Sequence, residues 1–252
     1  MNNDNLVDFV ASYEPLLRVN SPSEKVLAAM RRVDRRSFVP PYSGSLPWEV
    51  ELVVQGLLRD QYHLDPESVP LKEIPYLNVA LPIGYDQTCS QPSVVALMAS
   101  LLQLEPGMRV LEVGTGCGYN AAILAEIVGP SGQVISIERI APLVDVARQN
   151  LSAHFGREYE QRVTVVHGDG SLGHMERAPY ERVVFTAGIQ RERFDITTII
   201  EQCSTGIHIY SQHMGPLVVE KYREGKMKRQ DFLGNFGFVP LKRGIDPGYY
   251  FT

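Results

Sequence analysis

The chain has 252 residues, of which 44% are hydrophobic and 21% charged, which suits one large globular domain or two small ones. Its formal net charge is −5 and it holds no long run of Lys or Arg, which disfavours a nucleic-acid partner. No stretch approaches the roughly 18 consecutive apolar residues of a membrane span, and Met1–Asn5 lacks the pattern of a signal peptide.

The first predicted helix follows Ser21. The run Ser21–Glu24 combines an N-cap serine, a proline suited to the first turn and a capping-box glutamate, and residues 26–33 carry apolar side chains at helical spacing. A second helix is predicted over residues 91–103, where Pro106-Gly107 prevents its continuation.

A proline-rich stretch separates these two helices. Residues 40–80 contain six prolines and one amphipathic segment at 48–58. We therefore expect residues 1–80 to form a helical and irregular extension packed on a core domain of residues 81–252, the two making one compact unit.

From residue 108 the pattern alternates between strand and helix. The predicted strands are 109–113, 133–137, 163–167 and 182–186, and the predicted helices are 119–128 and 141–154. This alternation predicts an α/β fold with a Rossmann-like parallel sheet and helices on both faces. Residues 216–220 and 236–240 flank a polar turn at 224–226, which predicts antiparallel strands at the C-terminal end of the sheet.

The most informative segment is the loop after the first of these strands. Glu112 stands two residues before Gly114, and further glycines follow at 116 and 118. A dinucleotide site needs a glycine or alanine where Tyr119 stands, and a phosphate loop needs a lysine that this loop lacks. The pattern E-x-G-x-G-x-G is instead typical of S-adenosylmethionine (SAM) methyltransferases. The alternative is an ordinary glycine-rich turn.

Two further strand ends carry acidic residues in register with this loop. Glu138, 20 residues after Gly118, is suited to accept hydrogen bonds from ribose hydroxyls, and Asp169 with Gly170 is suited to an adenine amino group. The alternatives are a solvated charge and a tight turn. Three such signals at the carboxyl ends of successive strands favour a SAM site, in which Glu112 organises the loop or the methionine end.

The cysteines and histidines predict neither disulfides nor a metal site. Cys89, Cys117 and Cys203 form no C-x-x-C pair, and their number is odd. The six histidines show no metal-ligand spacing. A reduced, cytoplasmic setting fits this pattern best, without a membrane partner.

Several segments occur in the order typical of one protein family and together make up somewhat over half of the chain. They are Ala29–Pro40, Leu81–Pro92, Arg109–Glu126, Val134–Asn150, Val165–Gly170, Ala178–Ala187 and Phe238–Leu241. They resemble the protein-L-isoaspartate O-methyltransferases, and the Q-T-x-S-Q-P stretch from Gln87 is their most diagnostic part. The resemblance implies methyl transfer from SAM to an isoaspartyl carboxylate in a damaged peptide or protein, with S-adenosylhomocysteine as the other product.

The resemblance also implies residue roles. SAM would be held by Gly114, Thr115, Gly116, Gly118, Glu138, Asp169 and Gly170. Thr88 and Ser90 would be catalytic, with Cys89 lining the site between SAM and the substrate carboxylate. The other substrate-side candidates are Asp86, Thr186, Ala187 and Gly188. A carboxylate is already ionised at pH 7 and needs no general base, so a hydroxyl such as that of Ser90 suffices to orient it. Ser90 as a simple helix N-cap is the alternative.

Four departures from the family's pattern leave the acceptor open. Asp86 stands where the family has glycine, and Thr186–Ile189 alters the strand end that faces the substrate. Residues 190–215 lack the family's turn and strand, and residues 41–78 are longer than usual. The alternatives to protein repair are an aspartyl O-methyltransferase that matures a ribosomal peptide through an aspartimide, and a SAM-binding protein without turnover.

Overall fold

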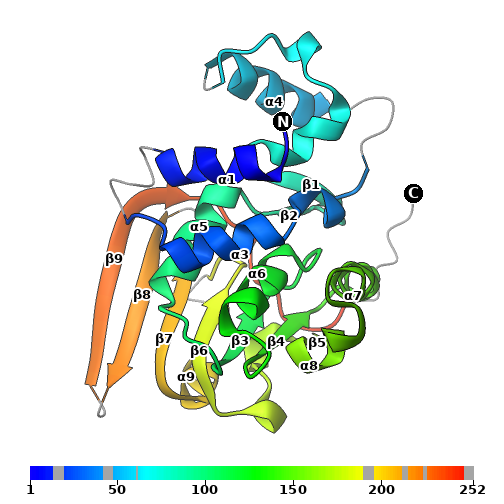
Figure 1. Cartoon of the computed structure of the whole chain (residues 1–252). Helices are drawn as coiled ribbons and strands as arrows, with labels where there is room; N and C mark the ends of the chain where they lie inside the picture. Colours follow the sequence, from blue (N-terminus) through cyan, green and yellow to red (C-terminus); the bar gives the residue numbers. More distant parts are fainter. Residues whose placement is uncertain are drawn as a thin grey trace.

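A seven-stranded sheet forms the centre of the computed structural model, which describes residues 1–13, 20–41, 48–60, 62–189, 196–211, 215–223 and 226–246. The strands lie in the order β5-β4-β3-β6-β7-β8-β9 (Figure 1). Their bounds are β3 Arg109–Val113, β4 Gln133–Glu138, β5 Val163–His167, β6 Tyr180–Phe185, β7 Cys203–Ser211, β8 Gly215–Arg223 and β9 Lys226–Phe236. Strands β3 to β7 are parallel, and β8 and β9 continue the sheet in antiparallel fashion.

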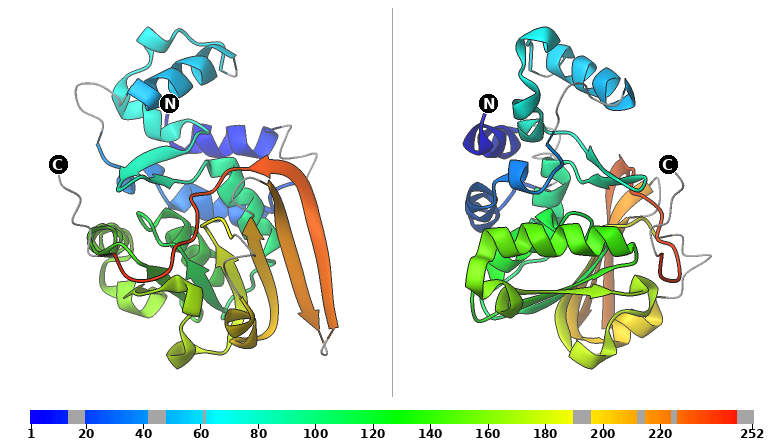
Figure 2. Two further views of the ribbon diagram at one scale, coloured as in Figure 1. Left: turned by 180° about the vertical axis from the view of Figure 1, so that it is seen from behind. Right: turned by 90° about the vertical axis from the view of Figure 1, so that its right-hand side faces the viewer.

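Alternating side chains of the central strands supply two separate cores. Val110 and Val134 belong to the larger core, which includes residues of α5 (Pro92–Leu101), α6 (Tyr119–Val128) and α7 (Ala141–Phe155). Leu111 and Ile135 point to the opposite face, where the short helix α9 (Thr197–Glu201) contributes Ile199. Because both faces of the sheet are covered, the sequences of these strands are nearly continuous runs of apolar residues. Figure 2 shows the two faces from behind and from the side.

The N-terminal extension adds helices on the side of α5 and α6 (Figure 1). Its helices are α1 (Asn3–Ser12), α3 (Glu24–Arg32) and α4 (Trp48–Asp60), with short 3-10 turns η1 (Arg35–Ser37), η2 (Pro66–Ser68) and η3 (Leu71–Tyr76). A hairpin of β1 (Leu81–Gly84) and β2 (Gln87–Cys89) then leads into α5.

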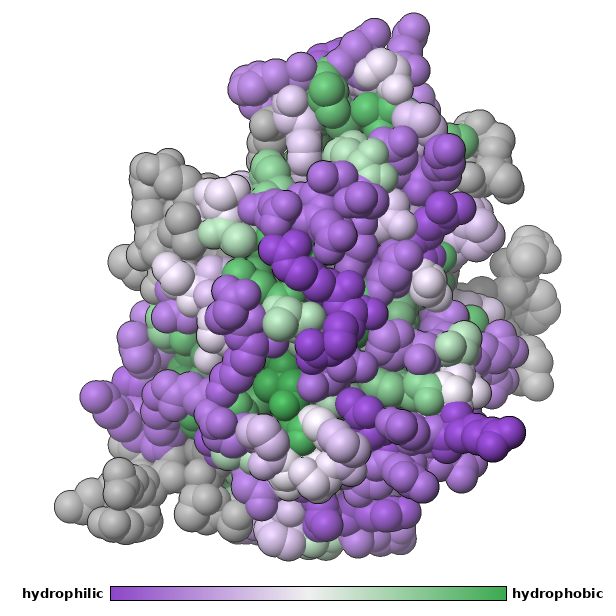
Figure 3. Space-filling model, in the orientation of Figure 1, coloured by the Kyte–Doolittle hydropathy of each residue, from purple (hydrophilic) through white to green (hydrophobic). Residues whose placement is uncertain are grey.

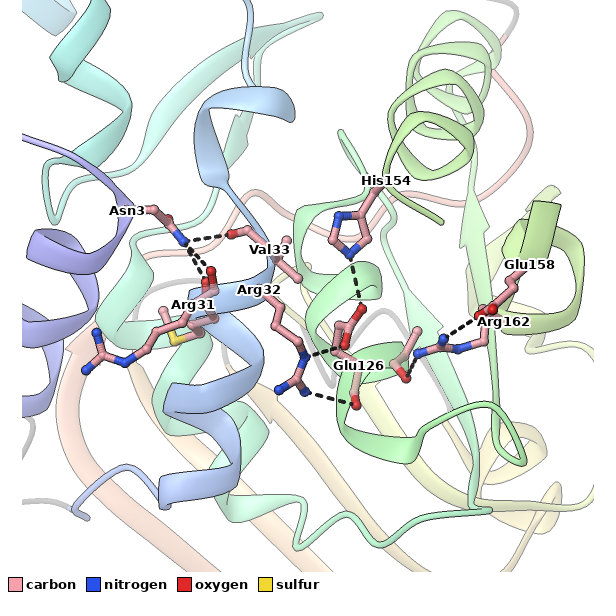
Figure 4. Close-up of polar contacts among 10 residues, drawn as sticks. Asn3, Arg31, Arg32, Val33, Glu126, His154, Glu158 and Arg162 are labelled. Carbon is pink, nitrogen blue, oxygen red and sulfur yellow. Dashed lines mark hydrogen bonds and ion pairs between the residues drawn. The ribbon is translucent and has the colours of Figure 1, made fainter. Parts of the chain in front are cut away.

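Polar contacts join α3 to the helices on either side of it (Figure 4). Asn3 of α1 donates from Nδ2 to the carbonyl of Met30 at 2.8 Å. Arg32 Nε lies 2.5 Å from one carboxylate oxygen of Glu126 in α6, and His154 Nε2 of α7 lies 3.2 Å from the other. The hydrogen bonds from His154 and Arg32 lower the pKa of Glu126 to about 2. The extension is thus bonded to the helical layer of the sheet.

The side of the molecule that is seen in Figure 1 has a mainly hydrophilic surface (Figure 3). Hydrophobic residues gather there in small groups, one of them in the region of α4. The large apolar side chains with the highest exposure include Trp48 and Leu52 of that helix, at 67% and 63%. Within the described ranges, no helix is both long and apolar enough to span a bilayer.

The predicted strands and helices of the parallel sheet are confirmed to within two residues, as is the amphipathic segment at 48–58, which is α4. The first predicted helix is also present, as α3, but it begins at Glu24 and its N-cap residue is Ser23, without a side-chain capping bond. The predicted capping box of Ser21–Glu24 is therefore wrong.

Two predictions for the C-terminal third are also wrong. Residues 190–215 do contain a strand, β7, because Ile207, Ile209 and Tyr210 are buried against the two cores. The predicted antiparallel pair is confirmed as β8 and β9, but the bounds of its second strand are wrong: β9 covers Lys226–Phe236 instead of residues 236–240, and the chain then crosses the sheet edge. In the predicted turn, residues 224 and 225 lie outside the described part of the chain.

Candidate active site

A cavity of about 740 Å³ opens at the carboxyl ends of β3, β4 and β6. Its wall includes β2 and the approach to α5, the loop after β3, the residues after β6, and residues 236–239 at the end of β9 and just beyond it. The strand order reverses between β3 and β6, and open parallel sheets bind ligands at such a point. The volume is that of a site for a cofactor-sized molecule.

The cavity brings together only part of the predicted site. The predicted residues that line it are Thr88, Cys89, Ser90, Gly114, Thr115, Gly116, Glu138, Thr186 and Ala187. The predicted residues that lie outside its lining are Asp86, Glu112, Gly118, Asp169, Gly170 and Gly188. Among the residues that the structure describes, no group of His, Cys, Asp or Glu side chains is arranged to hold a metal ion.

Gly114 brings the backbone of the loop close to β6. Its φ is +102°, and a Cβ atom there would lie 2.4 Å from Oγ1 of Thr186. The Thr186 hydroxyl donates to the carbonyls of Val113, at 3.0 Å, and Gly114. Gly118 is the N-cap of α6 and packs against Leu151 of α7, so its position serves helix packing rather than the cavity wall. Only glycine fits at Gly114 without strain.

Glu138, at the end of β4, fixes the glycine loop that follows β3. Its Oε2 accepts a hydrogen bond from the Gly116 amide at 2.9 Å, and its Oε1 accepts one from the Ile140 amide at 3.0 Å. Burial raises the pKa of this carboxyl, against the opposing effect of the amide donors. Each carboxylate oxygen keeps a further lone pair, so this side chain can accept two hydroxyl donors, as a ribose diol requires.

Glu112 lies behind the loop and is fully buried. It accepts hydrogen bonds from Asn120 Nδ2, at 2.7 Å, and from the Ser136 hydroxyl, whose oxygen lies 2.6 Å from Thr115 Oγ1. Since Thr115 and Asn120 line the cavity, the carboxylate supports two wall residues through this chain of hydrogen bonds.

We expect Glu112 to make folding stability depend on pH. Burial of the carboxylate outweighs the hydrogen bonds from Ser136 and Asn120 and raises its pKa from 4.5 to about 7. A raised pKa in the folded state gives stability that is complete below the unfolded pKa and is lost as the pH rises through about 7. The free energy of unfolding should therefore fall by roughly 2 to 3 kcal/mol from about pH 5 to about pH 8 through this group.

Denaturant unfolding of the Glu112→Gln variant at several pH values in this range measures the effect. The variant should lose this part of the pH dependence, whereas Asp145→Asn, at an exposed position on α7, should keep it. An unchanged pH profile in Glu112→Gln would contradict the expectation.

Asp169 and Gly170 lie under the C-terminal segment of the chain instead of in the cavity wall. The Asp169 carboxylate accepts hydrogen bonds from the amides of Ser171, at 2.9 Å, and Gly244, at 2.7 Å. Burial alone would raise the pKa of Asp169, but these donors lower it. A Cβ atom at Gly170 would lie 2.6 Å from Val113 Cγ1. Both residues thus take part in packing at the carboxyl edge of the sheet and not in the cavity wall.

The segment that covers them crosses the carboxyl edge of the sheet (Figure 2). Pro240 forms a bridge with Gly188, and Asp246 forms one with Ile140. An ion pair of 3.1 Å between Arg139 Nη1 and Asp246 Oδ2 fixes its far end. Gly188 is therefore paired with this segment and does not face the cavity.

The hairpin and the approach to α5 form the other side of the cavity. Thr88 is exposed, Ser90 is half-buried and Cys89 is buried. The N-cap residue of α5 is Gln91, so the interpretation of Ser90 as a helix N-cap is wrong. Asp86 is exposed at the tip of the hairpin with a φ of 55°, outside the cavity wall.

Arg35 supports this wall, a role that sequence reasoning missed. Its guanidinium is fully buried and donates to five carbonyls: Pro75 (3.0 Å), Leu77 (2.9 Å), Val79 (2.7 Å), Ser90 (3.1 Å) and Cys89 (3.4 Å). The sequence places it in a run with Arg31, Arg32 and Arg36, all of which are exposed. No local signal separates the one buried arginine from its neighbours.

Comparisons with known proteins agree with this arrangement. A family model described as protein-L-isoaspartate(D-aspartate) O-methyltransferase (PCMT) matches residues 53–242. The chain is 36% identical over 231 residues to the protein-L-isoaspartate O-methyltransferase of Methanococcoides burtonii, covering 89% of this chain and 95% of that protein. It is 38% identical over 232 residues to that of Methanothrix thermoacetophila, covering 87% and 92%.

Two solved structures share the fold. A protein-L-isoaspartate O-methyltransferase matches with a TM-score of 0.72 and 24% identity, over 97% of this chain and 67% of that one. A putative protein-L-isoaspartate O-methyltransferase from Plasmodium falciparum, in complex with S-adenosyl-L-homocysteine, matches with a TM-score of 0.70 and 18% identity, over 96% and 99%.

Proposed function

Because the chain belongs to the protein-L-isoaspartate O-methyltransferase family, we propose that it methylates the carboxylate of L-isoaspartyl residues in damaged peptides and proteins, with SAM as donor. The observation that carries the proposal is a single cavity whose wall contains both the glycine loop and the Gln87–Gln91 segment. The first holds the donor and the second faces the acceptor. The free thiols of the chain fit a reducing compartment such as the cytoplasm.

The donor side of the cavity fits SAM. Glu138 supplies acceptors for the ribose hydroxyls, and the backbone at Gly114 and Gly116 leaves room where a side chain would intrude. Thr115 and Asn120 add polar groups to the same wall. Bound SAM supplies an electrophilic methyl group on a sulfonium sulfur. The remaining donor-side residues of the proposal, Gly118, Asp169 and Gly170, act by shaping the sheet edge around that wall.

The acceptor side suits a carboxylate nucleophile. The described lining contains no Lys, Arg or His side chain. No positively charged side chain there would therefore pair with an incoming carboxylate and reduce its nucleophilicity. Hydroxyl groups of Thr88 and Ser90 orient it by neutral hydrogen bonds, beside Cys89, Thr186 and Ala187. Catalysis then rests on alignment and on the exclusion of water from an already ionised group, and no general base is needed.

Methylation of matched peptides tests the proposal. With labelled SAM, an isoaspartyl peptide should give a base-labile methyl ester, and the corresponding aspartyl peptide should not. Specific labelling of the aspartyl peptide, or only of a cyclised peptide, would instead support a dedicated maturation enzyme. Binding of S-adenosylhomocysteine without labelling of any peptide would reject turnover and favour a SAM-binding protein.

A further inference from the structure

Arg35 contacts both walls of the cavity between which the methyl group must pass. On the acceptor side, its Nη2 donates to the carbonyls of Ser90, at 3.1 Å, and Cys89, at 3.4 Å. On the donor side, its Cζ lies 5.8 Å from the centroid of the Tyr119 ring, within the range of a cation–π interaction. Tyr119 is the first residue of α6, directly after the glycine loop, and lines the cavity. The buried guanidinium thus connects the donor wall with the acceptor wall.

The bonds on the acceptor side determine the direction in which the Ser90 side chain leaves the backbone. The carbonyls of Cys89 and Ser90 belong to the two peptide planes that flank the Ser90 Cα atom, and each plane is rigid. Because the same guanidinium holds both planes, it restricts the rotations about this Cα atom. The position of the Ser90 hydroxyl in the cavity wall therefore depends on Arg35.

A second route leads from Arg35 to the same wall through Asn78. The guanidinium donates to the carbonyls of Leu77 and Val79, at 2.9 and 2.7 Å, which lie on either side of Asn78. Asn78 is fully buried, and its Oδ1 accepts a hydrogen bond from the Ser93 amide at 2.9 Å. Ser93 lies in the first turn of α5 and lines the cavity. Arg35 therefore holds the acceptor wall at two places, by two carbonyls directly and by the start of α5 through Asn78.

We propose that Arg35 is a positioning residue for methyl transfer, which fixes the Ser90 hydroxyl relative to the glycine loop. The inference rests on the proposed function, because it concerns the alignment of donor and acceptor in that reaction. The carboxylate oxygen must approach the methyl carbon from the side opposite the sulfonium sulfur, so the two walls must keep their separation and direction. Arg35 is 0% exposed and does not line the cavity, so it acts on the ligands only through the residues that it holds.

Replacement of Arg35 is expected to slow the methyl-transfer step and to leave the binding of both ligands nearly unchanged. Displacements of about 1 Å can reduce the rate of such a reaction by about 100-fold. We expect the transfer rate of Arg35→Lys to fall at least roughly tenfold, because one ammonium cannot replace the planar fork of donors, and that of Arg35→Gln to fall further. The affinity for S-adenosylhomocysteine and the KM for the peptide should change by less than about threefold.

Single-turnover methylation of an isoaspartyl peptide by the purified full-length chain measures the transfer step, and calorimetry with S-adenosylhomocysteine measures donor binding. Arg36→Lys, at the exposed neighbouring residue, should leave both unchanged. Ile199→Ala is the control for lost stability, because Ile199 is buried in the core on the opposite face of the sheet and does not line the cavity. At a temperature where urea unfolding shows both variants to be folded, it should keep the transfer rate that Arg35→Lys loses.

Asn78→Ala is a second variant that leaves Arg35 in place and removes its route to Ser93. It should reduce the transfer rate by roughly threefold or more, again without weakening S-adenosylhomocysteine binding, and it tests the inference if Arg35→Lys does not fold. Transfer rates of both folded variants within about twofold of the unmodified chain would overturn the inference. So would an equal loss of rate in Ile199→Ala, or a loss confined to donor affinity or peptide KM.

A readout without turnover separates failure of this inference from failure of the proposed function. Hydrogen exchange of the segment 87–93 is measured with and without S-adenosylhomocysteine. Because Arg35 connects the two walls, the ligand should slow exchange in this segment of the unmodified chain and have a much smaller effect in Arg35→Lys or Asn78→Ala. If no peptide is methylated, this difference would still support the connection of the walls. A ligand effect of equal size in all chains, or none in any, would overturn it.

Discussion

Replacement of Glu138 by glutamine is expected to weaken S-adenosylhomocysteine binding by roughly 30-fold or more. The two carboxylate oxygens accept hydrogen bonds from the amides of Gly116 and Ile140, at 2.9 and 3.0 Å. A glutamine would turn its NH2 group toward one of these donors, so that one amide loses its acceptor and the glycine loop loses an anchor. The ribose would also lose a charged acceptor, and such hydrogen bonds contribute about 1.5 to 3 kcal/mol.

Isothermal titration calorimetry with S-adenosylhomocysteine measures this effect. Asp145→Asn is the control, because it makes the same chemical change at an exposed carboxylate on the neighbouring helix α7. Thermal unfolding should confirm that both variants are folded. An affinity of Glu138→Gln within threefold of the control would argue against a direct role of Glu138 in cofactor binding.

Arg35→Met should have the largest effect on stability, roughly 3 to 5 kcal/mol. The buried guanidinium is the shared donor of five carbonyls in residues 75–79 and 89–90. Methionine fills a similar volume but donates no hydrogen bond, so these carbonyls would be left buried without this donor. Arg35→Lys should recover only part of the loss, because one ammonium cannot match the planar spread of five N–H donors.

Urea unfolding of both variants measures the change, with Arg36→Met as control. Arg36 is the next residue of the same 3-10 turn and is exposed, so its loss should change stability by about 0.5 kcal/mol or less. The expectation would be wrong if Arg35→Met and Arg36→Met unfolded at the same denaturant concentration.

Arg35 also bears on the division of the chain at residue 80. The arginine belongs to the N-terminal extension, and its carbonyl partners lie on both sides of that boundary. The contact from Arg35 Nη2 to the Ser90 carbonyl joins the extension to the acceptor wall of the cavity. A truncation that removes the extension would therefore also remove support from the substrate side, so we propose that the two parts fold as one unit.

The sequence alone determined the parallel sheet and the position of the glycine loop at its carboxyl edge. The alternation of strands and helices between residues 109 and 167 depends on apolar spacing within about ten residues, and the structure confirms those elements. The glycine loop was readable for a similar reason, because the positive φ of Gly114 is a local requirement that restricts the residue type. Glu138 followed from its place at the end of the next strand.

The tertiary structure alone decided the features that depend on distant partners. Arg35 meets the Cys89 carbonyl across 54 positions of sequence, and Asp169 meets the Gly244 amide across 75. The sequence does not distinguish a buried arginine such as Arg35 from an exposed one. It also does not distinguish a carboxylate covered by a distant segment, such as that of Asp169, from one in an open binding site. The spacing of residues within a short segment carries no information on such pairs. Their members are far apart in the sequence and come into contact only when the whole chain has folded.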